Sequence, residues 1–141
     1  MSEVKIRVLG REDLSWANER YAEIKFKEST EKDVLVKASI GGRVAGLGRL
    51  VPVDENNAEL GGIYVFPEFR GKKIAEEIVR ALIEMNTFPV LWCIPFEPLE
   101  NFYRKFGFTH ITNEIVPEEI SDKVTWCEGR YPDKAILLVR S

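Results

Sequence analysis

The residues best suited to do chemistry lie in the segment 62–75, which reads GIYVFPEFRGKKIA. Its apolar start predicts a strand, its middle predicts a tight loop, and the periodic residues that follow predict a long helix. The first backbone N–H groups of a helix have no intrahelical partner and carry the positive end of the helix dipole. Gly71 leaves that backbone open to close approach, and Arg70, Lys72 and Lys73 add cationic side chains. The segment therefore suits a pyrophosphate, although the same residues equally suit a solvated helix start.

Two commoner phosphate-binding motifs are absent from the chain. No GxxxxGK[ST] segment occurs, which argues against a P-loop nucleotidase, and no GxGxxG follows a predicted strand, which argues against a dinucleotide-binding domain.

Hydrophobic patterns predict the elements that must position this segment. Asp13 suits the N-cap of a first helix, Gly41-Gly42 is typical of a hairpin, and Gly107 is expected to end the helix that Pro98 begins. The predicted strands are 4–9, 34–40, 44–53, 58–65, 88–94, 108–112 and 135–139, and the predicted helices are 14–25, 72–86, 98–105 and 118–127. Three consecutive strands form an antiparallel meander, and the whole order predicts an α+β protein with a mixed sheet.

The composition is that of one soluble domain spanning residues 1–141, with 45% hydrophobic and 30% charged residues. A formal net charge of -3 gives no general attraction to nucleic acid, although it allows a local basic patch. The single His110 and the two cysteines, Cys93 and Cys127, are too few for a His-rich or Cys-rich metal site. Catalytic protons would therefore pass through carboxylates, tyrosine or water.

Targeting signals are not evident in the sequence. The first ten residues lack the apolar core of a signal peptide, and the longest apolar run, 88–96, contains two prolines and is too short to cross a membrane. The cysteines form no CxxC motif and suit a reducing compartment. We expect a cytoplasmic protein with no membrane partner.

Two motifs carry a family resemblance. The pattern Val65-x-Pro67-x-Phe69-Arg70-Gly71-x-Lys73-Ile74-Ala75 resembles the acyl-CoA-binding motif of the GNAT acetyltransferase superfamily. The segment 101–108, NFYRKFGF, resembles the family's later Tyr-x-x-x-Gly-Phe segment, and the predicted order of elements is similar over nearly the whole chain. Two positions depart from the family: Lys73 replaces a loop glycine, and Phe96 stands where an asparagine often contacts the pantetheine arm.

The resemblance implies a mostly antiparallel central sheet flanked by helices, and it implies a site for acetyl-CoA. Backbone groups of Ile63, Tyr64 and Val65 would hold the pantetheine, and the Val65 N–H would polarise the acetyl carbonyl. The phosphates would be bound by the following loop and helix start, which contain Arg70, Gly71, Lys72, Lys73, Ile74 and Ala75.

The resemblance also implies an N-acetyltransferase that moves an acetyl group from acetyl-CoA to a primary amine by direct attack in a ternary complex, without a metal. Glu59 would act as the base, directly or through water, and its alternative is a solvated carboxylate at a strand end. If the strand is regular, Glu59 and Val65 share a face. Tyr103 would protonate the CoA sulfur, and its alternative is a core aromatic. Cys93 is expected to pack in a strand rather than to carry an acyl group.

The acceptor implied by the resemblance is a small-molecule or peptide amine. The family's acceptor region would include Tyr21, Phe26, Glu28, Trp92 and Trp126. The stretch 113–133 carries six acidic residues against two basic ones, which could attract a cationic amine or could form an ordinary solvated surface.

Two other functions stay open at this point. The departures at Lys73 and Phe96 motivate a non-catalytic acyl-CoA-binding or regulatory module of the same fold. A nucleic-acid-binding or protein-binding domain that uses this fold is a third alternative, which the overall charge disfavours for nucleic acid. Many members of the family are dimers, so a homodimer is compatible with the resemblance.

Overall fold

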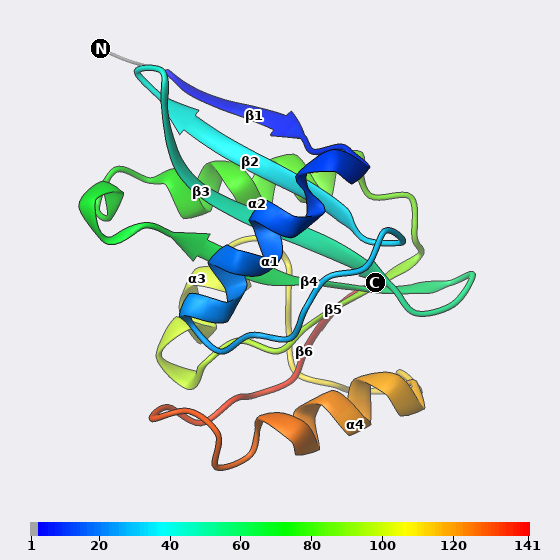
Figure 1. Ribbon diagram of the computed structural model, residues 1–141. Helices are drawn as coiled ribbons and strands as arrows, with labels where there is room; N and C mark the ends of the chain where they lie inside the picture. Colours follow the sequence, from blue (N-terminus) through cyan, green and yellow to red (C-terminus); the bar gives the residue numbers. More distant parts are fainter. Residues whose placement is uncertain (1–2) are drawn as a thin grey trace. The chain divides into compact units, whose positions relative to one another are not determined.

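The computed structural model describes residues 3–141, and its central feature is a six-stranded sheet in the order β1-β2-β3-β4-β5-β6 (Figure 1). The strands pair antiparallel between β1 and β2, β2 and β3, and β5 and β6, and they pair parallel between β4 and β5. The strands are β1 Val4–Val8, β2 Val34–Ile40, β3 Arg43–Pro52, β4 Asn57–Val65, β5 Val90–Cys93 and β6 Leu138–Arg140. The α-helices are α1 Leu14–Glu23, α2 Ile74–Met85, α3 Glu100–Arg104 and α4 Glu118–Cys127. The predicted mixed sheet flanked by helices is confirmed.

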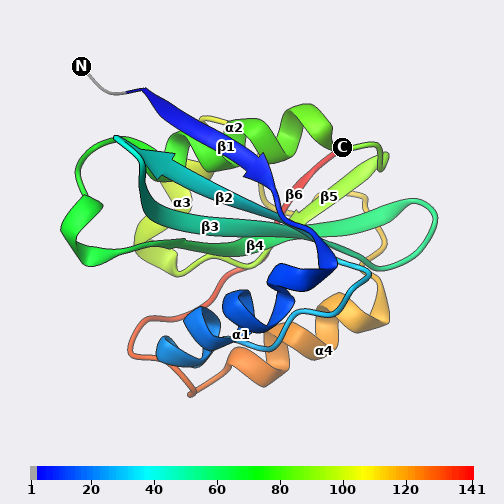
Figure 2. The ribbon, with the colours of Figure 1, turned by 45° about the horizontal axis from the view of Figure 1, so that its top comes forward.

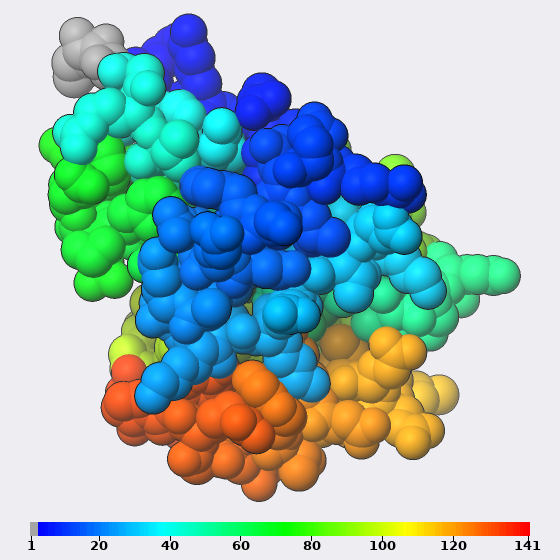
Figure 3. Space-filling view, in the orientation of Figure 1, coloured from blue at the N-terminus to red at the C-terminus, as the bar shows by residue number. Residues whose placement is uncertain are grey.

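The chain divides into two compact units, and the first contains the described residues 3–51 and 62–86. In this unit α1 and α2 lie on opposite faces of β1, β2 and β3, as two views of the ribbon agree (Figures 1 and 2). The space-filling view shows α1 and the loop after it, in blue, covering one face of this unit (Figure 3). Beneath α1 lies an apolar cluster in which Tyr21 packs with residues of β2 and β3. Helix α2 buries Ile74, Ile78, Val79 and Leu82, which is the apolar face that its period predicts.

The second unit contains residues 52–61 and 87–141. Its core is formed where α4 packs against β5 and β6, through Ile120, Trp92 and Val139. The indole of Trp92 donates a hydrogen bond from Nε1 to Asn57 Oδ1 at 2.8 Å, so the buried ring has its one polar group satisfied. This unit holds the first part of β4, including Glu59.

The expected boundaries were wrong at several element ends. Asp13 stands at the N-cap of α1, as predicted, but its carboxylate makes no capping hydrogen bond to the helix. The carboxylate accepts from the Gly10 N–H at 3.3 Å, in the turn before the helix. The predicted helix 72–86 begins at Ile74, because Lys73 has a left-handed backbone with φ of 61° that a helix cannot continue through.

Two predicted strands near the C-terminus are also shorter than expected. In place of a strand over 108–112, the structure has a single bridge between Thr109 and Val139. The last strand begins at Leu138 rather than at residue 135. Within residues 3–141, no helix combines the length and the apolar character needed to cross a membrane.

Candidate active site

Strand β4 carries a sharp irregularity in its middle. Gly62 has a φ of +61°, a left-handed conformation that glycine tolerates far better than other residues. Side chains alternate between the two faces only along extended backbone. The strand is therefore not regular between Glu59 and Val65, and alternation does not place their side chains on one face.

The residues expected to hold pantetheine, Ile63, Tyr64 and Val65, follow Gly62 directly and are half-buried. The Tyr64 hydroxyl donates to Glu23 Oε1 on α1 at 3.0 Å. Partial burial and that bond to the carboxylate both raise the pKa of Tyr64. The Phe66 N–H donates to the Ala45 carbonyl at 2.8 Å, so the chain is held to β3 just beyond these three residues.

The expected phosphate loop leaves β4 through a short 3-10 turn, Pro67–Phe69, and leads into α2. Phe69 is buried, and the Arg43 guanidinium lies 4.9 Å from the centre of its ring. The four residues from Arg70 to Lys73 are exposed, whereas Ile74 is buried and Ala75 is half-buried.

The start of α2 lies two residues later than the sequence predicts, and this shifts the candidate phosphate donors. The first helical bond joins the Glu77 N–H to the Lys73 carbonyl at 3.3 Å. The N–H groups of Ile74 and Ala75 therefore precede the first intrahelical bond, at the positive end of the helix dipole. The four residues before this helix start include three with cationic side chains, namely Arg70, Lys72 and Lys73.

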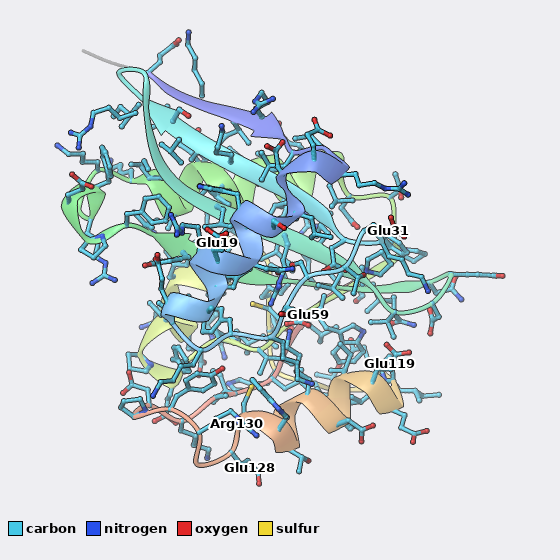
Figure 4. All side chains as sticks on the ribbon, viewed as in Figure 1. Glu19, Glu31, Glu59, Glu119, Glu128 and Arg130 are labelled. Carbon is cyan, nitrogen blue, oxygen red and sulfur yellow. The ribbon has the colours of Figure 1, made fainter. Side chains whose placement is uncertain are left out.

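Glu59, the expected base, is a buried member of an ion pair in the second unit. Its side chain in β4 is labelled in Figure 4, and the whole residue is 5% exposed. Lys123 Nζ on α4 lies 2.7 Å from Glu59 Oε1 and 2.9 Å from Oε2. The alternative of a solvated carboxylate at a strand end is therefore wrong.

Lys123 was not among the expected site residues. It follows Ile120 by three positions and precedes Cys127 by four, and these two are the buried residues of α4. Such spacing places Lys123 on the buried face of the helix. The sequence therefore contains a signal for a lysine that faces inward.

Within the second unit, Cys93 interacts with this pair, and Tyr103 interacts with Cys93. Burial raises the pKa of the Cys93 thiol well above its usual value, and the Glu59 carboxylate raises it further, while Lys123 opposes the rise. Burial, and then the neighbouring Cys93, raises the pKa of Tyr103 well above its usual value. Tyr103 therefore keeps its proton at neutral pH, and Cys93 is a thiol rather than a nucleophilic thiolate.

Comparison with known proteins identifies the family. Residues 5–108 match the family described as the Acetyltransferase (GNAT) family. The chain belongs to the GNAT acetyltransferase family. The motifs at 65–75 and 101–108 predict this family. No curated protein matches the chain by sequence.

Solved structures share the GNAT fold at low sequence identity. N-acetylglutamate synthase from Neisseria gonorrhoeae, crystallised with coenzyme A and L-arginine, superposes with a TM-score of 0.72 at 14% identity over 99% of this chain. The chain spans only 33% of the length of that synthase. Escherichia coli ElaA matches with a TM-score of 0.70 at 16% identity, and each chain is covered in full at 100%. A GNAT family acetyltransferase from Elizabethkingia anophelis with acetyl-CoA bound matches with a TM-score of 0.65 at 16% identity, over 98% of this chain and 97% of its own.

The two departures from the GNAT pattern have different structural settings. Lys73 takes the left-handed backbone that glycine favours, so this substitution keeps the loop conformation and changes the side chain. Phe96 packs edge-on against Tyr131, with 5.2 Å between ring centres. An aromatic side chain therefore occupies the position at which the family often has an asparagine.

Two of the residues expected around the acceptor belong to the core of this GNAT protein instead. Tyr21 and Trp92 are both 0% exposed, so neither side chain can line an acceptor site in this structure. Trp126 is half-buried, and the Arg130 guanidinium lies 4.0 Å from the centre of its ring. Within residues 3–141 there is no group of three or more His, Cys, Asp or Glu side chains that could hold a metal ion.

Proposed function

We propose that this GNAT protein is an N-acetyltransferase that moves an acetyl group from acetyl-CoA to a primary amine by direct attack in a ternary complex. The observation that carries the proposal is the loop between β4 and α2. It has left-handed backbone at Gly71 and Lys73, with φ of 82° and 61°, and it exposes three cations beside the start of α2. This combination suits the pyrophosphate of CoA. The solved relatives that carry CoA or acetyl-CoA support the same donor.

The proposed donor site uses the first unit. Backbone groups of Ile63, Tyr64 and Val65 hold the pantetheine, because these residues follow the irregularity at Gly62 and are half-buried. Phosphates are bound by the helix start and its cations, namely Arg70, Gly71, Lys72, Lys73, Ile74 and Ala75.

The proposed chemistry forms one N–C bond and breaks one C–S bond. The neutral amine attacks the thioester carbonyl carbon, and the Val65 N–H donates a hydrogen bond to the carbonyl oxygen as negative charge develops there. Glu59 takes the proton lost by the amine, directly or through water. Tyr103, which burial keeps protonated, gives a proton or a hydrogen bond to the departing sulfur.

The proposed acceptor is a cationic small-molecule or peptide amine. Glu59 already accommodates a primary ammonium in this structure, since it accepts two hydrogen bonds from Lys123. An acceptor amine offers the same donor chemistry. Exposed carboxylates in the stretch 113–133 would attract such a cation; they are Glu118, Glu119, Asp122, Glu128 and Asp133.

The proposed setting is a single acetyltransferase domain over residues 1–141 working in the cytoplasm. Strand β4 contributes residues to both compact units, which favours one functional domain. Both cysteines are free and buried, as suits a reducing compartment.

A non-catalytic acyl-CoA-binding module is the second candidate, and one observation favours it. Both oxygens of the proposed base are occupied by Lys123. Two measurements separate the candidates: an acetyl-CoA thermal shift, and free-thiol release over a panel of primary amines. We expect acetyl-CoA to raise the melting temperature and at least one amine to release CoA. A thermal shift without any release would favour the module, and the absence of a shift at saturating acetyl-CoA would contradict both.

A further inference from the structure

We infer that Tyr21 and Arg49 are positioning residues that hold the irregular backbone of β4 at Gly62 and thereby aim the peptide groups proposed to bind acetyl-CoA. The expected effect on acetyl-CoA binding rests on the proposed function. Its structural part stands on contacts within the first unit that Tyr21 and Arg49 make, and both residues lie outside the segment 62–75 that predicted the site.

The first contact fixes the carbonyl of Gly62. Tyr21, on α1, donates from its hydroxyl to the Gly62 carbonyl oxygen at 2.8 Å. Tyr21 is wholly buried among Leu9, Leu35 and Leu47, so its ring has little freedom to move. Burial also raises the pKa of Tyr21, so the hydroxyl keeps the proton that this bond requires.

The second contact fixes Tyr21 and fills the space behind Gly62. The Arg49 guanidinium on β3 lies 4.2 Å from the centre of the Tyr21 ring. Its Nη1 donates to the Lys27 carbonyl at 3.0 Å and to the Ser29 hydroxyl. Ser29 is itself held by Asn18, through bonds of 2.7 and 3.0 Å to its backbone. The guanidinium is therefore anchored by the loop that follows α1.

Arg49 is a charged residue in a buried position. It is 2% exposed, and its Nε has no hydrogen-bond partner. None of the ion pairs found in residues 3–141 neutralises it. A buried cation without a carboxylate is costly to stability. The cation–π contact with Tyr21 offsets part of that cost, which ties the two residues together.

The backbone at Gly62 fits these two side chains closely. A Cβ at this position would lie 2.6 Å from the Tyr21 hydroxyl oxygen and 2.8 Å from Arg49 Nε. Any side chain at residue 62 would therefore collide with both groups, besides being strained at a φ of +61°. Glycine is required here because the two side chains occupy the space that a Cβ would need.

The consequence for binding follows from the planarity of the peptide group. The Gly62 carbonyl and the Ile63 N–H belong to one rigid peptide plane and point in opposite directions. When Tyr21 holds the carbonyl, the Ile63 N–H is directed away from α1. Ile63 is one of the residues proposed to hold pantetheine, so Tyr21 sets the direction of a proposed ligand donor without touching the ligand.

The test compares Tyr21→Phe with Leu35→Val. Leu35→Val loses a methylene group in the same cluster and leaves the bond to Gly62 intact. At a temperature where both variants are folded, Tyr21→Phe should weaken acetyl-CoA binding about 10-fold. Binding of the nucleotide half of CoA, which lacks pantetheine, should not change. Leu35→Val should leave both affinities as in the wild type. Equal weakening of both ligands in Tyr21→Phe, or no weakening, would overturn the inference.

A measurement without ligand separates this inference from the proposed function. In the free protein, Tyr21→Phe should raise the amide exchange rates of residues 63–65 relative to Leu35→Val, because the β4 backbone loses its anchor. Unchanged exchange there would overturn the positioning role even if acetyl-CoA binds. If Tyr21→Phe shows this exchange effect but the wild-type protein does not bind acetyl-CoA, the result counts against the proposed function alone.

Discussion

Lys123 on α4 donates hydrogen bonds to both carboxylate oxygens of Glu59 on β4, at 2.7 Å and 2.9 Å. Both side chains are largely removed from solvent, so the pair replaces hydration with a direct contact. The carboxylate proposed to take the proton from the acceptor amine is thus already bonded to a primary ammonium.

Glu59→Gln should impair catalysis and stability together. The amide cannot accept a proton from the amine, so kcat should fall about 100-fold. It also leaves the Lys123 charge buried without its counter-ion, so the free energy of unfolding should fall by about 3 kcal/mol. Thiol release and urea unfolding measure the two effects. The double variant Glu59→Gln with Lys123→Met should recover stability but not turnover, and recovery of turnover in it would remove Glu59 from the mechanism.

Tyr103→Phe should separate turnover from donor binding. The variant keeps a ring that can pack against Phe102 and Phe108, whose centres lie 5.0 and 6.1 Å from that of Tyr103, and it loses only the hydroxyl. We expect kcat to fall at least about 10-fold while the Kd for acetyl-CoA stays near the wild-type value. A variant with wild-type kcat would show that the Tyr103 hydroxyl has no part in catalysis and that the residue is purely structural.

Alkaline pH should destabilise the protein through its buried tyrosines. Burial raises the pKa of Tyr103 well above its usual value of 10.0, so the folded state holds this proton more tightly than the unfolded state. This contribution to stability is complete below pH about 10 and is lost as the pH rises toward the folded-state pKa. The loss between neutral pH and pH about 11, measured by urea unfolding, should be smaller in Tyr103→Phe than in the wild type. An identical loss in the two proteins would contradict the burial argument.

Lys73→Gly should raise stability and lower donor affinity. Lys73 holds a φ of 61°, which costs a non-glycine residue about 1 kcal/mol, and glycine relieves that strain. The same change removes a cation from the proposed phosphate site, so the Kd for acetyl-CoA should rise and depend less on salt. Lys73→Ala is the matched control, because it removes the charge and keeps the strain. If Lys73→Gly binds acetyl-CoA as tightly as the wild type at low salt, the lysine makes no contact with the phosphates.

Cys93→Ala should leave the acetyl transfer nearly unchanged. The thiol is buried, and both burial and the Glu59 carboxylate raise its pKa, so it is a poor nucleophile at neutral pH. Direct attack by the amine does not require this thiol. We expect kcat to stay within about 3-fold of the wild type. An acetyl group found on Cys93 by mass spectrometry during turnover, together with loss of activity in the variant, would establish an acyl-cysteine route instead.

The sequence predicted the parts of the fold that depend on local patterns. The presence of strands β2, β3 and β4, the apolar face of α2 and the loop glycines all follow from periodicity or from φ preferences. The start of α2 was misplaced, because helical periodicity includes Lys72 and Lys73 while the backbone at Lys73 is left-handed. The segment 108–112 resembled a strand, yet only Thr109 finds a partner, on β6.

The site was less predictable, because its main contacts join residues far apart in the chain. Glu59 and Lys123 are 64 positions apart, and Tyr21 and Gly62 are 41 positions apart. No local pattern pairs such residues. The conformation of Gly62 was also hidden, since a glycine in a strand is compatible with either extended or left-handed backbone. Burial of Arg49 depends on the loop after α1, which carries no regular pattern.

The central claim is acetyl transfer to an amine, and it is tested most directly by mass spectrometry of a primary-amine panel incubated with the purified protein and acetyl-CoA. We expect one equivalent of acetylated amine for each free CoA released, and loss of both products in Glu59→Gln. Acetyl-CoA binding with no acetylated amine across the panel, or product formation that Glu59→Gln leaves unchanged, would contradict it.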